Sequence, residues 1–257
     1  MSTYNSTEMM TITAARALTS SDVCFVGIGA PSAACNLARL THAPGITLIY
    51  ESGTIGTCPD VLPLSIGDGE LAATALTTVS VPEMFRYWLQ GGRISIGFLG
   101  GAQIDRYANI NTTVIGPYDA PTTRLPGGGG APEIAVLCRE IFVTMKQAPR
   151  SFVADVDFVT SLGFGRDGQA RARLALTTKG PTRVMTDLGV LQPEMGTNEL
   201  IVTALHAGVT REQVSVATGW PVRFSPDLIE NAVPTGDELT VLRELHDRTA
   251  RAHGRAS

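Results

Sequence analysis

The sequence predicts an α/β fold with an open, mainly parallel sheet flanked by helices. Two observations support this prediction. Short apolar, partly β-branched runs, each suited to a buried strand, alternate along the chain with helical segments, as is typical of βαβ units. Glycine and proline (27 and 15 of 257 residues) follow many of these runs, at the places where α/β proteins have their binding loops.

The first βαβ unit is the clearest part of the pattern. A helix over Glu8–Leu18 precedes it. The unit has strands at Asp22–Val26 and Ile46–Tyr50, joined by a helix through Ala33–Leu40 with Pro31 placed for its first turn. Two strands joined through a helix are expected to be parallel.

Three capping boxes and several apolar runs predict the remaining elements. Each box places Ser or Thr three residues before Glu or Gln, a pattern that starts a helix. The boxes Ser80–Glu83, Thr210–Gln213 and Thr235–Glu238 predict helices through Phe85–Leu89, into Ala217 and over Asp237–Ala252, and a further helix is predicted over Glu133–Arg139. Strands are predicted at Ile94–Leu99, Ile141–Lys146, Phe152–Thr160, Thr182–Leu191 and Leu200–Leu205.

The chain shows no internal repeat, charge block or low-complexity linker at which to divide it. We therefore expect a single domain over residues 1–257, and 160–257 is the part that would form a sub-lobe of it. At this length one core buries roughly 70–75% of the surface of the unfolded chain, which is enough to fold without staples.

Charge and hydropathy exclude several classes of partner. The formal net charge of -4 and the absence of a basic stripe argue against a nucleic acid. No apolar run approaches the roughly 18–20 residues of a membrane span. The N-terminus has neither the positive nor the apolar region of a secretory signal, so we expect a cytoplasmic protein.

The four cysteines and four histidines show no spacing typical of a metal site. Cys24, Cys35, Cys58 and Cys138 fit reduced structural thiols, and we expect no metal and no permanently bound cofactor. Cys58 is interpreted as a small buried thiol, with a place in the same site as Glu51 as the alternative. The histidines are interpreted as non-catalytic, and the Gly-x-Ser-x-Gly elbow of serine hydrolases is absent.

Glu51 is the most unusual charged residue in the pattern. It ends the apolar run Ile46–Tyr50 and is followed by Ser52 and Gly53. A carboxylate at the end of a buried strand is partly desolvated and held in place, and this is how a protein makes a nucleophile of a group that is weak in water.

Two glycine-rich loops are further candidates. Gly27-Ile-Gly29 resembles a dinucleotide loop, but Ser32 stands where the third glycine would be, so the loop is interpreted as a tight turn whose helix N-terminus offers N–H groups to an anion. The run Gly127–Gly130 lies between two prolines and precedes a helix. It lacks the Lys-Ser/Thr of a Walker loop and can aim backbone N–H groups at an oxyanion, with a plain connector as the alternative.

Four segments in order resemble a known family: 27–34, Tyr50–Gly53, Leu99–Asn111 and Leu125–Ala131. Together they make the chain similar to the β subunit of family I CoA-transferases, of the glutaconate CoA-transferase type, over about residues 8–220. The resemblance implies an α/β fold and a partner α subunit in a heterodimer or α2β2 heterotetramer. It also implies an acyl-CoA thioester and a small carboxylic acid as substrates.

The resemblance also assigns roles to residues. Glu51 would be the nucleophile, Gly129 and Gly130 would hold the thioester oxygen, and the loop of Gly101 and Gln103 would line the CoA side. With Gly29, these residues form the candidate site. The implied mechanism is ping-pong, through an acyl-glutamyl anhydride and a glutamyl-CoA thioester on Glu51.

Two other functions stay open at this stage. Some proteins of this fold lack the glutamate and decarboxylate CoA thioesters or hydrolyse their carbon–carbon bonds, in steroid or aromatic degradation. A non-catalytic scaffold half is the other alternative. The Glu-Ser-Gly context of Glu51 favours CoA transfer between an acyl-CoA of a dicarboxylic or 3-oxo acid and a second acid.

Overall fold

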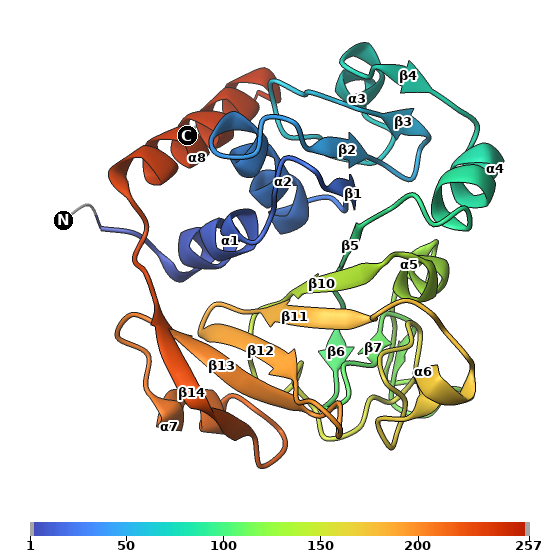
Figure 1. The fold of residues 1–257 in the computed structure, drawn as a ribbon, viewed down its shortest axis with the longest axis vertical. Coiled ribbons are helices and arrows are strands. Elements are labelled where there is room, and N and C mark those ends of the chain that lie inside the picture. The colour runs from blue at the N-terminus through green and yellow to red at the C-terminus, as the bar shows by residue number, and fades with distance from the viewer. Residues whose placement is uncertain (1–2, 255–257) are drawn as a thin grey trace. The chain divides into compact units, whose positions relative to one another are not determined.

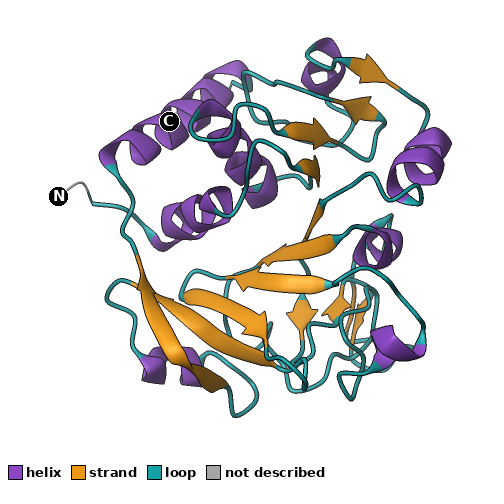
Figure 2. Cartoon of the chain, viewed as in Figure 1, coloured by secondary structure: helices purple, strands orange, loops and turns teal. Residues whose placement is uncertain are grey.

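The computed structural model describes residues 3–254. The chain forms two compact units, one with the residues up to Phe98 and from Val233 onward, and one with Leu99–Ala232. The α/β class is confirmed in both, with open sheets and helices beside them (Figures 1 and 2). The boundaries predicted for a sub-lobe at 160–257 are wrong, because the second unit begins at Leu99 and the C-terminal helix belongs to the first. The single domain over 1–257 stays a prediction.

The sheet of the first unit has the strand order β5-β1-β2-β3-β4. Its strands are β1 (Val23–Phe25), β2 (Thr47–Ile49), β3 (Thr54–Ile55), β4 (Thr77–Thr78) and β5 (Ile96–Leu99). β1 pairs in parallel with both β2 and β5, which confirms the predicted βαβ unit, whereas β3 and β4 are antiparallel additions. The parallel strands therefore end at one edge of the sheet, where α/β proteins bind their ligands.

Helices from both ends of the chain complete the first unit. They are α1 (Ser6–Arg16), α2 (Ala30–Leu40), α3 (Gly69–Ala73), α4 (Val81–Glu83), a π-helical turn η1 (Met84–Leu89) and α8 (Gly236–Ala252). Pro31 lies in the first turn of α2, and the capping boxes at Ser80 and Thr235 are both formed, as predicted. In Figure 1, α1, α2 and α8 lie together on one side of β1 and β2.

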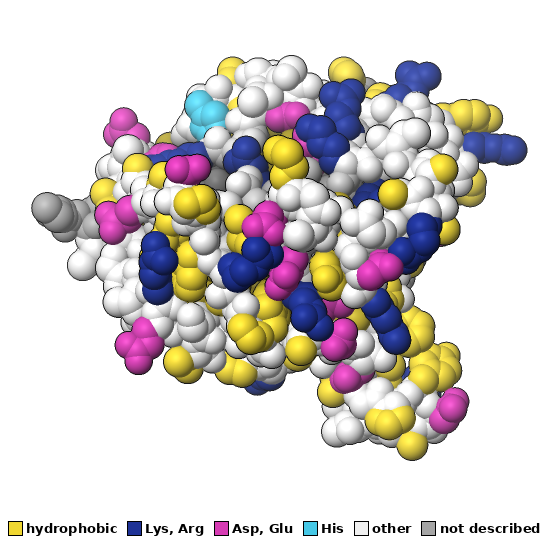
Figure 3. Space-filling view, turned by 60° about the horizontal axis from the view of Figure 1, so that its bottom comes forward, with side chains coloured by type: hydrophobic (Ala, Val, Ile, Leu, Met, Phe, Trp, Pro, Cys, Tyr) yellow, Lys and Arg dark blue, Asp and Glu magenta, His cyan; other side chains and the backbone are white. Residues whose placement is uncertain are grey.

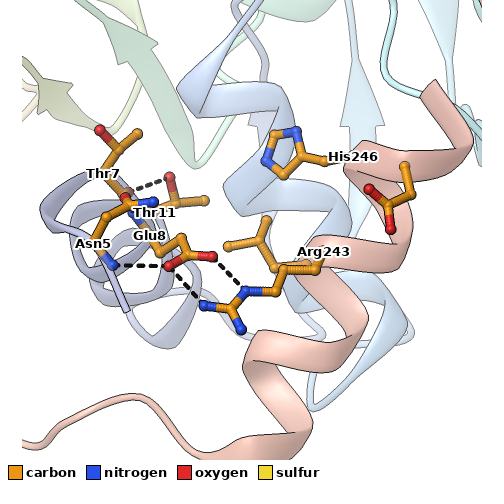
Figure 4. A pocket seen from close by; sticks show the side chains of 8 residues that line it. Asn5, Thr7, Glu8, Thr11, Arg243 and His246 are labelled. Atoms are coloured by element: carbon orange, nitrogen blue, oxygen red, sulfur yellow. Dashed lines mark hydrogen bonds and ion pairs between the residues drawn. The ribbon is translucent and has the colours of Figure 1, made fainter. Parts of the chain in front are cut away.

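Charged side chains join α1 to α8. Arg243 Nε donates to Glu8 Oε1 at 2.7 Å, and this pair lines a cavity of about 220 Å³ that also contains His246 (Figure 4). Arg243 holds the pKa of the Glu8 carboxyl below its usual value. A second pair, Arg16 with Glu238, joins the same two helices. The buried leucines of α8, Leu239, Leu242 and Leu245, provide the apolar part of this packing.

The main sheet of the second unit has the order β10-β11-β12-β13-β14. Its strands are β10 (Glu140–Thr144), β11 (Pro181–Met185), β12 (Gly189–Pro193), β13 (Leu200–His206) and β14 (Arg223–Asn231). β10 with β11 and β13 with β14 are parallel, and β12 is antiparallel to both of its neighbours. The single strand predicted at Thr182–Leu191 is wrong, because Thr186 donates its N–H to Gly189 O at 2.8 Å and so closes a hairpin between β11 and β12.

Two small sheets and three helices complete the second unit. They are β6 (Gln103–Ile104) with β7 (Ile110–Asn111), β8 (Val114–Ile115) with β9 (Thr123–Arg124), and α5 (Ala131–Leu137), α6 (Ala170–Arg173) and α7 (Arg211–Val216). The capping box at Thr210 is formed, as predicted. The strand predicted at Phe152–Thr160 is wrong: the segment is irregular and pairs with other residues only through isolated bridges at its borders.

The surface and the helices carry two further findings. On the face drawn in Figure 3, Lys and Arg side chains are interspersed with Asp and Glu and form no continuous basic band. Among residues 3–254, no helix is long and apolar enough to span a membrane.

Candidate active site

Glu51 lies at the tip of a tight hairpin between β2 and β3. Gly53 donates its N–H to Tyr50 O at 3.0 Å, and Tyr50 donates its own to Thr54 O at 3.1 Å. This is the hydrogen-bond pattern of a three-residue hairpin loop, which needs a positive φ at its third residue, and Gly53 has a φ of +100°. The loop-rich stretch expected after Glu51 therefore begins with a defined turn that holds the glutamate in a fixed position.

Gly53 is required by packing as well as by conformation. A Cβ at this position would overlap the carbonyl oxygen of Val79. Val79 also donates its N–H to Gly53 O at 2.9 Å, so the tip of the hairpin is bonded to the segment that leads into α4. The absent side chain makes room for this neighbouring backbone rather than for free space behind the carboxylate.

Tyr50 anchors the other side of the hairpin. Its side chain is fully buried, and its hydroxyl forms a 2.8 Å hydrogen bond with Ser32 Oγ in the first turn of α2. Burial raises the pKa of the Tyr50 phenol and keeps it neutral, with the Ser32 hydroxyl acting in the opposite direction. The residue before Glu51 is thus tied to the helix whose N-terminus faces the same edge of the sheet.

The Glu51 carboxylate itself is half-buried and has no partner. Within the described part of the chain, its side chain makes no hydrogen bond and no ion pair. Two neighbouring hydroxyls, Ser52 Oγ and Thr54 Oγ1, are buried and likewise lack a partner among the described residues. A carboxylate whose lone pairs are free can attack a carbonyl, and unpaired hydroxyls beside it can donate to a bound substrate.

Gly29 lies at the same sheet edge as Glu51. The parallel register pairs Phe25 with Ile49, and Val26 donates its N–H to Ile49 O at 2.8 Å. The turn after β1 and the hairpin after β2 therefore lie side by side. Gly29 has a φ of +84° and precedes α2, whose N-terminus is not capped by any side chain of the described residues. This end of α2 can accept an anion, as the sequence predicts.

The glycine-rich loop of the second unit presents backbone donors. Gly127 donates its N–H to Thr112 O at 2.8 Å, and this bond anchors the loop. Gly127 and Gly129 have φ values of +98° and +51°, which only glycine adopts readily. The N–H groups of Gly128, Gly129 and Gly130 donate to no residue that the structure describes. Adjacent free N–H groups are the donors that an oxyanion requires.

Gln103 has a framework role in the structure. Its buried side chain accepts hydrogen bonds at Oε1 from Asn111 Nδ2 at 2.7 Å and from the Asp157 N–H at 3.1 Å, and its Nε2 donates to Asp157 Oδ2 at 3.0 Å. These bonds fix the loop of residue 157 against β6 and β7. A contact of Gln103 with CoA stays a prediction.

Other residues of the segment Leu99–Asn111 are structural. The buried Asp105 carboxylate accepts from the N–H groups of Tyr107 and Asn109 and from the Asn109 amide, at 2.8–3.1 Å. Asn109 Oδ1 in turn accepts from the N–H groups of Gly163 and Gly165 at 3.0 and 3.1 Å. The segment recognised in the sequence thus fixes a loop architecture.

The structure places the predicted site residues in two groups. Glu51 and Gly29 are together in the first unit, and Gly101, Gln103, Gly129 and Gly130 are in the second. Because the two groups belong to different units, a single site formed by both stays a prediction. Sequence reasoning missed the unpaired hydroxyls of Ser52 and Thr54, for which no motif gives a signal.

Cys58 is the residue whose predicted environment is wrong. The predicted buried thiol is exposed, because the chain after Gly56 leaves the sheet and places the side chain outside. Cys24, Cys35 and Cys138 are buried and free. His206 is buried and donates from Nε2 to Thr186 O at 2.8 Å, a structural role. Among the described residues, no group of His, Cys, Asp and Glu is arranged to hold a metal ion.

A free carboxylate on a rigid hairpin and a loop of unpaired N–H groups are features of acyl-transfer enzymes, and the relatives of the chain agree with this class. The chain belongs to the coenzyme A transferase family, whose profile matches residues 7–217. The resemblance to family I CoA-transferase β subunits, and with it the prediction of a CoA-transferase enzyme, is confirmed.

Three relatives place the chain within the family. It is 59% identical to the β subunit of 3-oxoadipate CoA-transferase from Pseudomonas knackmussii over 99% of this chain and 98% of that protein. It is 33% identical to the β subunit of glutaconate CoA-transferase from Acidaminococcus fermentans, over 95% and 93% of the two chains, and the crystal structure of that enzyme matches with a TM-score of 0.89, covering 96% of each chain. The IpdB subunit of a cholesterol ring-cleaving hydrolase from Mycobacterium tuberculosis is 27% identical over 84% and 83%.

Proposed function

We propose that this chain is the β subunit of a 3-oxoadipate CoA-transferase, active in the cytoplasm with an α subunit. The substrate assignment is supported by the 59% identity, over nearly the whole length of both chains, to a protein that carries this name. The partner is supported by the names of the relatives, which describe each as one subunit of its enzyme. The observation that carries the function is the partnerless Glu51 carboxylate, among the described residues, at the tip of its fixed hairpin.

The reaction begins with attack of a Glu51 oxygen on the thioester carbonyl of the acyl-CoA. The carbon–sulfur bond breaks, which gives an acyl-glutamyl anhydride and the CoA thiolate. The thiolate then attacks the glutamyl carbonyl, which releases the first carboxylate and leaves a glutamyl-CoA thioester. The acceptor acid repeats these steps in reverse and departs as the new acyl-CoA.

Each addition in this sequence places negative charge on a carbonyl oxygen. The free N–H groups of Gly129 and Gly130 support a role as donors to that oxygen. Loss of one such donor typically lowers kcat by about 10²–10³-fold. The carboxylate needs no general base, because it is already ionised at neutral pH.

Intact-mass spectrometry of the complex with the α subunit tests the mechanism. We expect 3-oxoadipyl-CoA, added without an acceptor acid, to leave CoA covalently attached to the peptide that contains Glu51. The adduct should be absent in Glu51→Ala and present in Glu244→Ala, a control that removes an exposed carboxylate of α8. Full exchange activity in Glu51→Ala, or an adduct on another peptide, would contradict the proposal.

Hydrolysis of a carbon–carbon bond in a CoA thioester is the second candidate. It is supported by the 27% identity to the cholesterol ring-cleaving hydrolase subunit. In that case water replaces the acceptor acid, and the acyl chain is cleaved without an adduct on Glu51. An assay with and without acceptor acid separates the two functions, because exchange stops without the acid and hydrolysis does not.

A further inference from the structure

The second unit contains a cavity of about 630 Å³ that the proposed chemistry does not use. Its walls come from the loop after Leu99, the β8–β9 hairpin and the segment that follows β10. The lining residues are Gly101, Ala102, Ile115, Thr123, Thr144, Met145, Lys146, Ala148, Arg150 and Ser151. The volume is in the range of about 300–1,000 Å³ that is usual for small-molecule sites.

The charges on this cavity all have one sign. Lys146 and Arg150 line it, and no Asp or Glu is among the lining residues. Both cations are exposed, and within residues 3–254 neither side chain makes a hydrogen bond or an ion pair. Elsewhere in the same unit, exposed cations such as Arg173 and Arg223 are paired with carboxylates. Two unpaired cations at one cavity attract an anion.

The segment that carries the two cations is held in place. Ser151 donates its N–H to Ala148 O at 2.9 Å and its hydroxyl to Lys146 O at 3.0 Å. Gln147 donates its N–H to Asp187 Oδ1 at 2.8 Å. The backbone N–H groups of Lys146 and Arg150 donate to no residue in the described part of the chain. The segment thus offers side-chain and backbone donors from a fixed position, which lowers the entropic cost of binding.

We propose that this cavity binds the phosphates of CoA, with Lys146 and Arg150 as the phosphate-binding residues. The inference rests on the proposed function, since it assumes a CoA thioester as substrate. CoA carries a diphosphate and a further phosphate on its ribose, and Lys and Arg are the usual side chains that bind such groups. A six-carbon dicarboxylate would leave most of the cavity empty. Gly101, which the family resemblance places on the CoA side, lies in the wall of the same cavity.

Calorimetric titration of the complex with the α subunit tests this proposal. The ligands are CoA and pantetheine, which has the same thiol arm and no phosphate. The variants are Lys146→Gln, Arg150→Gln, the double variant and Arg139→Gln, which removes an exposed cation of the same unit that does not line the cavity. We expect each cavity substitution to weaken CoA binding about tenfold, since a hydrogen bond to a charged group contributes at least that much. The double variant should lose roughly 100-fold, with pantetheine binding and the Arg139→Gln variant unchanged.

Charge and salt provide the second readout. Lys146→Arg and Arg150→Lys keep the charges and should bind CoA within about threefold of the wild type. The double Gln variant should also show a weaker dependence of CoA affinity on salt than the wild type. Unchanged CoA binding in the double variant overturns the proposal, as does an equal loss in Arg139→Gln.

An increase of the KM for the acceptor acid without a change in CoA affinity also overturns it, because the cavity would then bind a carboxylate. The test is independent of turnover. If the wild-type complex exchanges no acid but its CoA affinity still depends on Lys146 and Arg150, the transfer function fails and the phosphate site stands.

Discussion

Glu51 and Asp105 are two carboxylates with opposite surroundings. Asp105 in the second unit is buried, and both of its oxygens accept hydrogen bonds from the loop that it organises. Glu51 in the first unit is half-buried on a hairpin that is bonded on every side, yet its own oxygens accept nothing from the described residues. The first carboxylate holds the structure together, and the second is held by it.

The comparison shows how one functional group serves two purposes. A fully hydrogen-bonded carboxylate stabilises the fold, because its removal leaves several buried donors unsatisfied. A carboxylate without partners contributes little to stability, and its reactivity is the only reason to keep it in so constrained a position. The two should therefore respond in opposite ways to substitution.

The largest effect is expected for Glu51→Ala. Loss of the nucleophile should lower kcat for CoA exchange by about 10⁴-fold or more. The free energy of unfolding should change by less than about 0.5 kcal/mol, since no contact is lost. Exchange kinetics and chemical denaturation of the same preparations measure the two quantities. A large loss of stability would show that Glu51 has a structural partner and would end the contrast with Asp105.

Asp105→Ala should give the reverse result. The N–H groups of Tyr107 and Asn109 would lose their acceptor, and we expect a loss of about 2–4 kcal/mol in the free energy of unfolding. The exchange activity of the folded fraction should fall by less than about tenfold. Asn109→Ala should not add its full effect to that of Asp105→Ala, because the two side chains share hydrogen bonds. Additive effects in the double variant would contradict the loop architecture.

Gly53→Ala sharpens the comparison at the hairpin. The added Cβ meets the Val79 carbonyl oxygen and a φ of +100°, so the turn must shift. We expect kcat to fall by about 10²-fold, since a displacement of roughly 1 Å at a reacting group has that effect. Gly69→Ala is the control, because a Cβ there has nothing within 4 Å. Equal activity of the two variants would mean that the position of Glu51 does not depend on this turn.

The smallest effect is expected for Glu8→Gln. Its ion pair with Arg243 is partly exposed, so its loss should cost about 0.5–1 kcal/mol near neutral pH. Because the pKa of Glu8 is lowered in the folded protein, this contribution is present above the usual value of 4.5 and disappears as the pH falls through the lowered one. Denaturation curves of wild type and Glu8→Gln should therefore converge in acid. A constant difference across this range would contradict the assignment.

Local signals in the sequence were sufficient for much of the fold. The βαβ unit follows from the strands around Pro31 and its helix, and all three predicted capping boxes are formed, because these features depend on residues close in sequence. β14 was missed: its residues are mostly exposed and include Pro226, so its pairing with β13 depends on distant partners rather than on an apolar run.

The candidate site divides in the same way. Glu51 and the glycine-rich loop stand out in the sequence because their residue types are unusual in their positions. The bond from Val79 to Gly53, the occupied amide of Gln103 and the unpaired state of Lys146 and Arg150 among the described residues depend on which residues tertiary folding brings together. A single sequence carries no local signal for them.

The return of α8 to the first unit bears on the order in which a growing chain can mature. Residues 99–232 are contiguous and can complete their contacts while the ribosome is still translating the remainder. The Glu51 hairpin belongs to the other unit, whose helical layer lacks Leu239, Leu242 and Leu245 until the last turns of α8 have emerged. The nucleophile-bearing part of the protein is therefore finished only at the end of synthesis.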